Sequence, residues 1–402
     1  MRTAFLTLDH FLIQHQAFWR FEPFFASLEA TLPATWQTHA PELCHWLGTL
    51  SNQQVEEYLQ QPEALVDVLA PHISGLSEAL RLGQLPTLEA SPSPLPAAFH
   101  AGIPGRKLHQ IESMGTQAMA IHNCDEWLEW CSGKGFLGRV LSYHTQHPVM
   151  SVEYQQALCE SGAAQSLALG INNQRFIQAD VLQQGIDDVF HSRQHAVALH
   201  ACGDLHQTLI KKVVMHQLPA VSLSPCCYHL TANNEYQPLS NVAQQSSLRL
   251  NRAELRIPLQ QTVTGGERVK RHRQLEMSYR LGFDILLSQE LGLSEYVPIP
   301  SIKKSSLAQG FKAFCLWAAA CKQQQLPDCD FDYYQKLGTE RFWHMERLSL
   351  VQSLFKRPLE IWLVLDKAQF LAESGYNVTV SEFCERHITP RNVLIQATKA
   401  VE

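Results

Sequence analysis

The chain has 402 residues, of which 45% are hydrophobic and 17% are charged, and its formal net charge is -6. This length exceeds what one ordinary hydrophobic core accommodates, so two or three domains are expected. The apolar content excludes a disordered chain, and the negative net charge means that any contact with nucleic acid requires a local basic patch.

The cysteines and the apolar runs bear on the cellular compartment. The 11 cysteines are scattered, no secretion signal precedes them, and no apolar run is long enough to span a bilayer. We therefore expect a cytoplasmic protein without a membrane segment, whose thiols are free.

Residues 1–95 are predicted to form an N-terminal helical domain. Apolar residues recur at helical spacing in two stretches, which are Trp19, Phe21, Phe24, Phe25, Leu28 and Leu32, and then Val55, Tyr58, Leu59, Leu65, Val66 and Leu69. The segment Ser91-Pro-Ser-Pro-Leu-Pro96 has the composition of a stiff linker. This region contains no glycine-rich turn or acid pair, so its sequence does not reveal a role.

From residue 96 to residue 240 the pattern changes to strands that alternate with helices. A helix over 105–122 precedes the first strand, and strands are predicted at 126–131, 148–152, 175–178, 195–200 and 220–223. Short apolar strands separated by helix-length segments predict a parallel sheet with helices on both faces. This segment is the first part of an α/β core.

The rest of the chain divides into a helical insertion and the end of the core. Residues 241–355 read as mostly helical, and residues 356–402 supply a last helix and two short strands near 378–380 and 393–395. The turn Thr389–Asn392 between these strands predicts a terminal hairpin. The predicted fold is therefore α/β, with a Rossmann-like, mostly parallel sheet and an antiparallel last strand.

A glycine-rich turn, Cys131-Ser-Gly-Lys-Gly-Phe-Leu-Gly138, follows the first predicted strand and runs directly into a helix. Gly133 and Gly135 let the backbone pass close to a ligand. The helix that follows directs its unpaired N–H groups and the positive end of its dipole at that ligand. This geometry is typical of a site for a nucleotide-like cofactor.

Two classes of enzyme share this turn. Gly133, Gly135 and Gly138 satisfy the G-x-G-x-x-G fingerprint of dinucleotide-binding oxidoreductases, with Glu153 on a ribose hydroxyl. Glu129-x-Cys131-x-Gly133-x-Gly135 resembles instead the acid-x-G-x-G-x-G signature of class I methyltransferases, in which Gly138 is an ordinary helix residue. A P-loop is excluded because Leu128 and Gly135 stand where glycine and Ser or Thr are required.

Features outside the turn favour the methyltransferase. Asp180 follows the third strand, where it suits a hydrogen bond to an adenine amino group, and polar, compact loops follow the fourth and fifth strands. Methyltransferase sheets typically close with an antiparallel strand, as the terminal hairpin predicts, whereas a dehydrogenase continues into a second parallel half. The simpler alternative is that the glycines are ordinary turn residues and that Glu153 is a solvated strand end.

Four motifs in order carry a resemblance to a known family. They are Cys131-Ser-Gly-Lys-Gly-Phe-Leu137, His200-Ala-Cys-Gly-Asp-Leu205, Ser224-Pro-Cys-Cys-Tyr-His229 and Thr389-Pro-Arg-Asn-Val-Leu394. Over about residues 100–240 and 355–400 the chain resembles a little-characterised family of class I methyltransferases. That family has bacterial members, eukaryotic methyltransferase-like proteins and the glutathione-S-transferase C-terminal-domain-containing protein, and it is distantly similar to a tRNA 2′-O-methyltransferase.

The resemblance implies S-adenosylmethionine as cofactor. The expected cofactor-binding residues are Glu129, Cys131, Ser132, Gly133, Gly135, Glu153, Asp180, His200 and Asp204. Cys131 stands where the broader signature has its first glycine. Asp204 has an alternative role as the cap of the helix that begins at Leu205. Arg106, Lys107 and His109 resemble a basic stretch before the family's first strand, and a solvated helix face is their alternative role.

The loop Ser224–His229 is the expected place of the methyl acceptor. Tyr228 is predicted to stack on a planar acceptor, His229 to accept a proton, and Cys226 to belong to the same catalytic loop. The alternative for Cys226 and Cys227 is that they are small buried apolar residues. A metal site is the alternative role of Cys202, Cys226, Cys227, His200 and His229. We expect no metal there, because zinc ligands are usually separated by two to four residues, adjacent cysteines rarely bind zinc together and the chain has no C-x-x-C.

The acceptor is expected to be RNA, with tRNA as the first candidate. A cluster of Arg268, Lys270, Arg271 and Arg273 is the best segment for binding a phosphate backbone. A protein or a small molecule stays open as acceptor. Two other functions also stay open, which are an NAD(P)-dependent oxidoreductase and a non-catalytic RNA- or protein-binding module that has kept the cofactor pocket.

Overall fold

The computed structural model describes residues 1–88, 94–183, 185–259 and 266–400. The chain divides into two compact units. The first, here called the sheet unit, consists of Met1–Ile13, Ala79–Leu259 and Arg357–Glu402, and the second, the helical unit, of Gln14–Glu78 and Gln260–Lys356. Among the described residues, no helix has the length and apolar character needed to cross a membrane.

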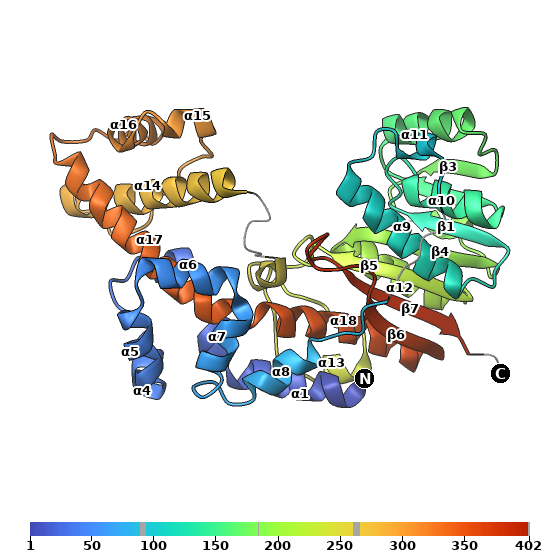
Figure 1. Cartoon of the computed structure of the whole chain (residues 1–402), viewed down its shortest axis with the longest axis horizontal. Helices are drawn as coiled ribbons and strands as arrows, with labels where there is room; N and C mark the ends of the chain where they lie inside the picture. Colours follow the sequence, from blue (N-terminus) through green and yellow to red (C-terminus); the bar gives the residue numbers. More distant parts are fainter. Residues whose placement is uncertain (89–93, 184, 260–265, 401–402) are drawn as a thin grey trace. The chain divides into compact units, whose positions relative to one another are not determined.

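The sheet unit is built on one seven-stranded sheet with the order β3-β2-β1-β4-β5-β7-β6 (Figure 1). The strands are β1 (Glu126–Trp130), β2 (Val149–Glu153), β3 (Gln174–Gln178), β4 (Gln194–Cys202), β5 (Ala220–Cys226), β6 (Tyr376–Glu382) and β7 (Val393–Lys399). The first five pair in parallel, while β7 is antiparallel to both β5 and β6. The predicted mostly parallel sheet with an antiparallel last strand is confirmed.

Helices connect these strands as the sequence predicts. The helices of the sheet unit are α1 (Arg2–Gln14), α8 (Leu76–Leu82), η1 (Ala97–His100), α9 (Gly105–Ala120), α10 (Phe136–Thr145), α11 (Gln156–Ala168), η2 (Ile186–Val189), α12 (Asp204–Met215), α13 (Asn241–Gln244), η3 (Glu254–Leu259) and α18 (Lys356–Glu373). All residues of β1 and β2 are buried, which explains their largely apolar sequences. One core cluster joins α9 and α10 to β1, β2, β4 and β7.

The first helix belongs to the sheet unit rather than to a separate N-terminal domain. The carboxylate of Asp9 in α1 accepts hydrogen bonds from the indole N–H of Trp362, at 2.8 Å, and from the hydroxyl of Ser246, at 2.6 Å. The backbone N–H of Leu88 donates to the carbonyl of Glu382 in β6, at 2.8 Å. The grouping therefore differs from the predicted domain 1–95, and residues 91–93 of the predicted linker lie outside the described residues.

Residues 241–259 also group with the sheet rather than with the predicted insertion 241–355. The reason is Asp366 of α18, which is fully buried. It accepts hydrogen bonds from the hydroxyl of Tyr236 (2.6 Å), the backbone N–H groups of Leu239 (2.9 Å) and Ser240 (2.8 Å), and the hydroxyl of Ser240 (2.7 Å). This anchor fixes the segment after β5 to the last helix of the core.

The helical unit combines two segments that are distant in the sequence. Its helices are α2 (Gln16–Trp19), α3 (Pro23–Ala26), α4 (Ala34–His39), α5 (Pro41–Thr49), α6 (Asn52–Gln60), α7 (Pro62–Leu69), α14 (Glu267–Leu291), α15 (Lys304–Leu307), α16 (Phe311–Cys321) and α17 (Phe331–Ser353). The side-chain amide of Gln352 in α17 donates to the carbonyls of Trp19 and Phe21, at 2.8 and 2.5 Å. These bonds join the N-terminal helices to the insertion.

Candidate cofactor site and acceptor loop

The turn between β1 and α10 runs through left-handed backbone conformations. Cys131, Gly133 and Gly135 have φ values of 55°, 59° and 67°. A Cβ atom on Gly135 would lie 2.5 Å from both the Gln174 amide nitrogen and the Phe176 ring, so only glycine fits there. The φ value of Cys131 explains why the broader methyltransferase signature has glycine at this position.

Glu129 lies beneath the turn and supports it. Its carboxylate accepts hydrogen bonds from the Ser151 hydroxyl, at 2.6 Å, and from the backbone N–H groups of Leu137 and Gly138 at the start of α10. Burial raises the pKa of Glu129 to about 7, although these hydrogen bonds oppose the rise. Glu129 therefore positions the helix. It is not among the residues that line the cavity described below.

Gly138 has a packing role that the sequence did not predict. A Cβ atom there would collide with the Glu129 carboxylate, so Gly138 is not an ordinary helix residue in this methyltransferase-like turn. The amide of Gln174 completes the support, because it donates to the Gly135 carbonyl and to the Ser151 hydroxyl, both at 2.9 Å. Ser151 and Gln174 are buried polar residues in strands, and their supporting role was not predicted because their burial becomes visible only in the fold.

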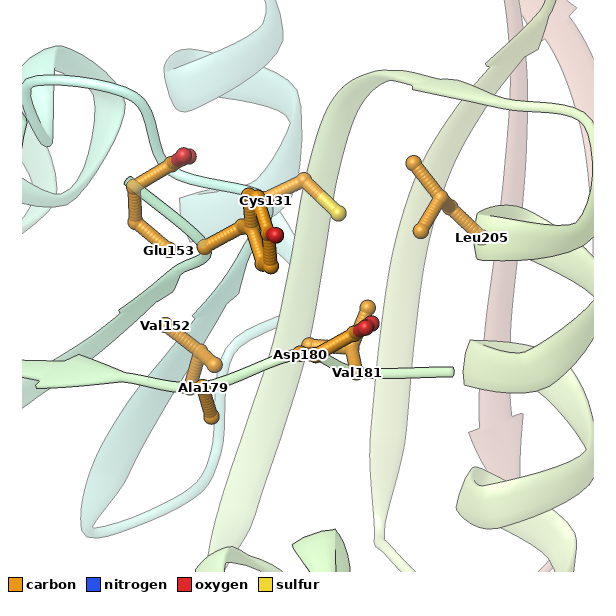
Figure 2. Close-up of a pocket in the computed structure, with 8 residues that line it drawn as sticks. Cys131, Val152, Glu153, Ala179, Asp180, Val181 and Leu205 are labelled. Atoms are coloured by element: carbon orange, nitrogen blue, oxygen red, sulfur yellow. The ribbon is translucent and has the colours of Figure 1, made fainter. Parts of the chain in front are cut away.

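A cavity of about 350 Å³ opens beside the turn. It is lined by Cys131, Val152, Glu153, Tyr154, Ala179, Asp180, Val181 and Leu205. In Figure 2, the sulfur of Cys131 points toward Leu205, and the carboxylates of Glu153 and Asp180 come from two different strand ends. The two predicted strand-end acids thus share one cavity, whose remaining walls are mostly apolar.

Glu153 and Asp180 accept few hydrogen bonds within the protein, so both carboxylates can accept further hydrogen bonds from a ligand. The two carboxylate oxygens of Glu153 accept from the backbone N–H groups of Gly133 and Gln155, each at 2.9 Å. Asp180 accepts from the N–H of Leu182, at 3.1 Å. Because an ionised carboxylate has about four lone-pair sites, each acid can still accept hydrogen bonds from hydroxyl or amino groups of a ligand.

The acceptor carboxylates and the apolar walls of the cavity fit the nucleoside part of S-adenosylmethionine. The hydroxyl oxygen of Ser132 in the turn is buried and has no hydrogen-bond partner within the described part of the chain. Apolar walls from Val152, Ala179 and Val181 suit the faces of a flat base. A buried polar atom of this kind is expected to be satisfied by a ligand or by water.

His200 and Asp204 are not among the residues that line this cavity. His200 has a φ of 62° at an irregularity in β4, and its Nε2 lies 2.6 Å from the Gln110 amide oxygen. Burial, with help from Arg391 and Lys107, lowers the pKa of His200 to about 4. Asp204 does not cap α12, because its carboxylate instead accepts from the N–H of Ala232, at 2.7 Å.

In the predicted acceptor loop, Tyr228 is buried whereas His229 is half-buried. The Tyr228 side chain is 3% exposed, and its ring packs near His206 (5.7 Å between centroids) and under the Lys367 ammonium (5.3 Å). This burial leaves no open face on which an acceptor would stack. His229 is half-buried, and burial together with Arg256 and Arg391 lowers its pKa.

Three thiols meet where β4 and β5 end. The sulfur atoms of Cys202, Cys226 and Cys227 all lie within 4.8 Å of one another, and those of Cys202 and Cys226 are 3.3 Å apart. The hydrogen bond with Cys226 lowers the pKa of Cys202 to about 6, whereas burial raises that of Cys227. Cys202, Cys226 and Cys227 belong to the ligand set that their spacing in the sequence disfavoured as a metal site. The fold nevertheless brings their three sulfurs together, whereas His200 and His229 are not part of this cluster.

The basic residues that the sequence singled out before the first strand and in the insertion lie on α9 and α14. On α9, the Lys107 ammonium lies 5.4 Å from the centre of the Phe136 ring, and His109 Nδ1 lies 3.4 Å from the Ser113 hydroxyl. On α14 of the helical unit, Lys270 pairs with Glu267 (2.8 Å) and Arg273 with Glu346 (2.7 Å), while Arg268 and Arg271 are exposed to solvent. Part of the charge of this cluster is therefore neutralised within the protein.

Comparison with known proteins gives one family match. Residues 106–234 match the family model of a methyltransferase domain. Comparison with curated proteins gives no match.

Solved structures match over about a third of the chain. The tRNA (uracil-54, C5)-methyltransferase of Pyrococcus abyssi, in complex with S-adenosyl-L-homocysteine, is 14% identical, with a TM-score of 0.25, over 29% of this chain and 28% of that one. TrmN from Thermus thermophilus is 19% identical, with a TM-score of 0.26, over 31% and 40%. A geranyl diphosphate methyltransferase in complex with GPP and sinefungin is 15% identical, with a TM-score of 0.27, over 35% and 54%.

The chain thus spans well under two thirds of each of these three structures. The family match and the observed strand order make residues 106–234 part of a class I methyltransferase domain, whose methyl donor is S-adenosylmethionine. After β5, the described residues contain no second parallel half-sheet, which is what the oxidoreductase alternative required.

Proposed function

We propose that the chain is an S-adenosylmethionine-dependent RNA methyltransferase. The observation that carries methyl transfer is the shared cavity of Glu153 and Asp180 beside the turn of a methyltransferase domain. RNA as the acceptor is supported by cationic groups near the acceptor loop and on α14. A tRNA is the first RNA to test, and the cytoplasm is the compartment in which we expect the reaction.

The donor side needs residues that hold and orient the cofactor. S-adenosylmethionine, when bound, would supply the methyl group of its sulfonium, which would pass to an acceptor nucleophile as S-adenosylhomocysteine leaves. We assign Glu153 to the ribose hydroxyls and Asp180 to the adenine amino group, an assignment supported by the cavity that both carboxylates line. Such a reaction needs chiefly position and orientation, which the rigid turn and strand ends provide.

On the acceptor side, His229 is the candidate proton acceptor. Its lowered pKa means that it is mostly neutral at pH 7 and so can accept a proton from a hydroxyl or amino group. His200 is a weaker base, with a pKa of about 4. Tyr228 is buried and is not proposed as a stacking surface.

The charges near the acceptor loop favour an anionic acceptor. Arg256 and Arg391 both lower the pKa of His229, and Arg391 and Lys107 lower that of His200. Three cations therefore act on the two histidines at the ends of β4 and β5. The phosphate groups of RNA are attracted by these positive charges. The exposed Arg268 and Arg271 on α14 are suited to further contacts with the RNA backbone.

The first experiment identifies the acceptor class. The full chain is incubated with S-adenosylmethionine that carries a labelled methyl group, together with the RNA, protein and small-molecule fractions of cells that lack this protein. We expect label in RNA, in the tRNA fraction first. Label confined to protein or to small molecules would overturn RNA as the acceptor, and cofactor binding without transfer to any fraction would favour the non-catalytic module.

The second experiment tests the α14 cluster. The double variant Arg268→Glu, Arg271→Glu is expected to bind RNA more weakly, and the slope of log affinity against log salt should fall by about 1 for each phosphate that the protein no longer neutralises. Lys303→Glu, Lys304→Glu is the matched control, because it reverses two exposed charges on the same unit. Equally weakened RNA binding in the two variants would remove the α14 cluster from the RNA-binding surface, and affinity for S-adenosylhomocysteine should stay unchanged in both.

A further inference from the structure

Two parallel strands bring three sulfur atoms together at one edge of the sheet. Cys202, the last residue of β4, pairs in register with Cys226, the last residue of β5, and their sulfurs are 3.3 Å apart. The sulfur of Cys227 lies within 4.8 Å of both. Within the described ranges, no other three histidine, cysteine or acidic ligand atoms gather this closely.

The backbone at Cys227 explains how two adjacent cysteines reach the same place. Successive side chains of a strand point to opposite faces, so a continued strand would separate the two sulfurs. Cys227 instead has a φ of 45°, in the left-handed region. A non-glycine residue in this conformation costs about 1 kcal/mol or more, and such strain tends to persist at functional sites.

The distances suit direct coordination of one ion. Sulfurs that bind zinc at about 2.3 Å in a tetrahedral arrangement lie about 3.8 Å apart. The observed separations, 3.3 Å for one pair and at most 4.8 Å for the others, are close to this value. Cys226 is buried, while Cys202 and Cys227 are only half-buried, so an ion has access from one side.

From this geometry we propose that Cys202, Cys226 and Cys227 bind a thiophilic metal ion of the zinc class. Three soft sulfur ligands select such ions over Mg²⁺ or Ca²⁺. Three protein ligands leave a fourth coordination position for water or another small ligand, as in zinc sites that are not purely structural. Each thiol releases its proton when it binds the metal as a thiolate.

The surrounding charge balances this site. Three thiolates and one divalent ion carry a net charge of about -1 in this ligand arrangement. The guanidinium of Arg391 acts electrostatically on all three thiols, and the carbonyl of Arg391 accepts a hydrogen bond from the Ser224 hydroxyl of β5, at 3.3 Å. The cation therefore offsets the remaining charge. This inference is independent of the proposed RNA acceptor and concerns metal binding alone.

The test uses the full-length wild-type chain, purified in a reducing, metal-free buffer. Thiols are alkylated with and without one equivalent of Zn²⁺, and the modified cysteines are mapped by mass spectrometry. We expect Zn²⁺ to protect Cys202, Cys226 and Cys227, while the exposed Cys321 is labelled equally in both samples. Titration with Co²⁺ should give the sulfur-to-cobalt charge-transfer absorption of a thiolate site, with a stoichiometry of one.

Variants then assign the ligands. Cys202→Ser should abolish the cobalt–thiolate band or weaken binding at least tenfold, whereas the control Cys321→Ser should bind like the wild type. Binding of S-adenosylhomocysteine is measured in parallel to show that each variant is folded. If Zn²⁺ protects none of the three thiols in the reduced wild-type chain, or if mapping finds a Cys202–Cys226 disulfide that replaces metal binding, the proposal is overturned whatever the outcome of the methylation assay.

Discussion

At position 131 the backbone adopts a conformation that favours glycine, yet the residue is cysteine, with a φ of 55°. The Cys131 side chain lines the cofactor cavity, so its sulfur has room there. A β-branched residue has less room than cysteine for this backbone, because its two γ atoms crowd the neighbouring peptide groups.

The first prediction compares substitutions at this position. Cys131→Gly should match wild-type stability within about 1 kcal/mol, because relief of backbone strain offsets the greater freedom of glycine in the unfolded chain. Cys131→Val should lower the free energy of unfolding by about 1–2 kcal/mol or more. Urea unfolding of the intact chain measures both. A valine variant as stable as the wild type would contradict the strain assigned to this residue.

Asp180 carries the second prediction. Asp180→Ala removes a carboxylate that lines the cavity, and affinity for S-adenosylhomocysteine should fall about tenfold or more, as expected for one charged hydrogen bond. Isothermal titration calorimetry gives the affinity. Asp188→Ala, at an exposed position in the same region of the sheet unit, is the matched control. Equal affinity in the wild type and Asp180→Ala would remove Asp180 from the site.

That Glu153 and Asp180 would line one cavity was predictable because a strand fixes the place of each. Glu153 ends β2 and Asp180 follows β3, and the carboxyl ends of adjacent parallel strands lie at the same side of the sheet. The positions of Tyr228 and Asp204 were not predictable, because their contacts involve residues from other segments. Tyr228 packs near Lys367, and Asp204 accepts a hydrogen bond from the N–H of Ala232.

Among the elements, α10 depends on a single buried carboxylate below its first turn. Glu129 accepts hydrogen bonds from the backbone N–H groups of Leu137 and Gly138, and burial raises its pKa from 4.5 to about 7. Between these two values the folded chain holds a proton that the unfolded chain has released. Stability from this group is therefore fully present below about pH 4.5 and is lost as the pH rises through about 7.

The third prediction concerns the loss of stability that the raised pKa of Glu129 implies as the pH rises. The free energy of unfolding of the wild type, relative to that of Glu129→Gln, should fall on the order of 3 kcal/mol as the pH rises from about 4.5 to well above 7. The glutamine variant cannot titrate here, so it serves as the reference at every pH. Urea unfolding across the pH range provides the measurement. A difference that stays constant, or that grows with pH, would show that Glu129 ionises normally in the folded chain.

Most elements of the sheet unit were predictable because their patterns are local. The five parallel strands and the terminal hairpin have short apolar sequences bounded by polar turns or helices, and their positions agree with the structure within a few residues. Hydrogen bonds between distant segments were not predictable. Ser151 and Gln174, which support the glycine turn, read as ordinary polar positions until their strands lie side by side.

For the molecule as a whole, the order of segments in the sequence differs from their grouping in space. The sheet unit takes its parts from Met1–Ile13, Ala79–Leu259 and Arg357–Glu402, and the helical unit takes the two segments between them. Periodicity predicted a helical domain over residues 1–95, yet it gave no means of assigning α1 and the later N-terminal helices to different units. That assignment depends on pairs such as Asp9 and Trp362, which are 353 positions apart.

The fourth prediction tests whether α1 stabilises the sheet unit. Asp9→Ala removes the acceptor for the indole N–H of the fully buried Trp362 and for the hydroxyl of Ser246. Unsatisfied buried donors of this kind destabilise by about 1–3 kcal/mol each. Hydrogen–deuterium exchange should therefore become faster in α18, which contains Trp362, and the midpoint of urea unfolding should decrease.

A matched control separates this effect from a general loss of negative charge. Asp67→Ala removes an exposed carboxylate from α7 of the helical unit, and it should leave exchange in α18 unchanged. If Asp9→Ala leaves α18 as protected as in the wild type, α1 contributes little to the sheet unit. If exchange rises in α18 for Asp9→Ala alone, Met1–Ile13 stabilises the unit that contains the methyltransferase domain, although Gln14–Glu78 of the helical unit separates the two in the sequence.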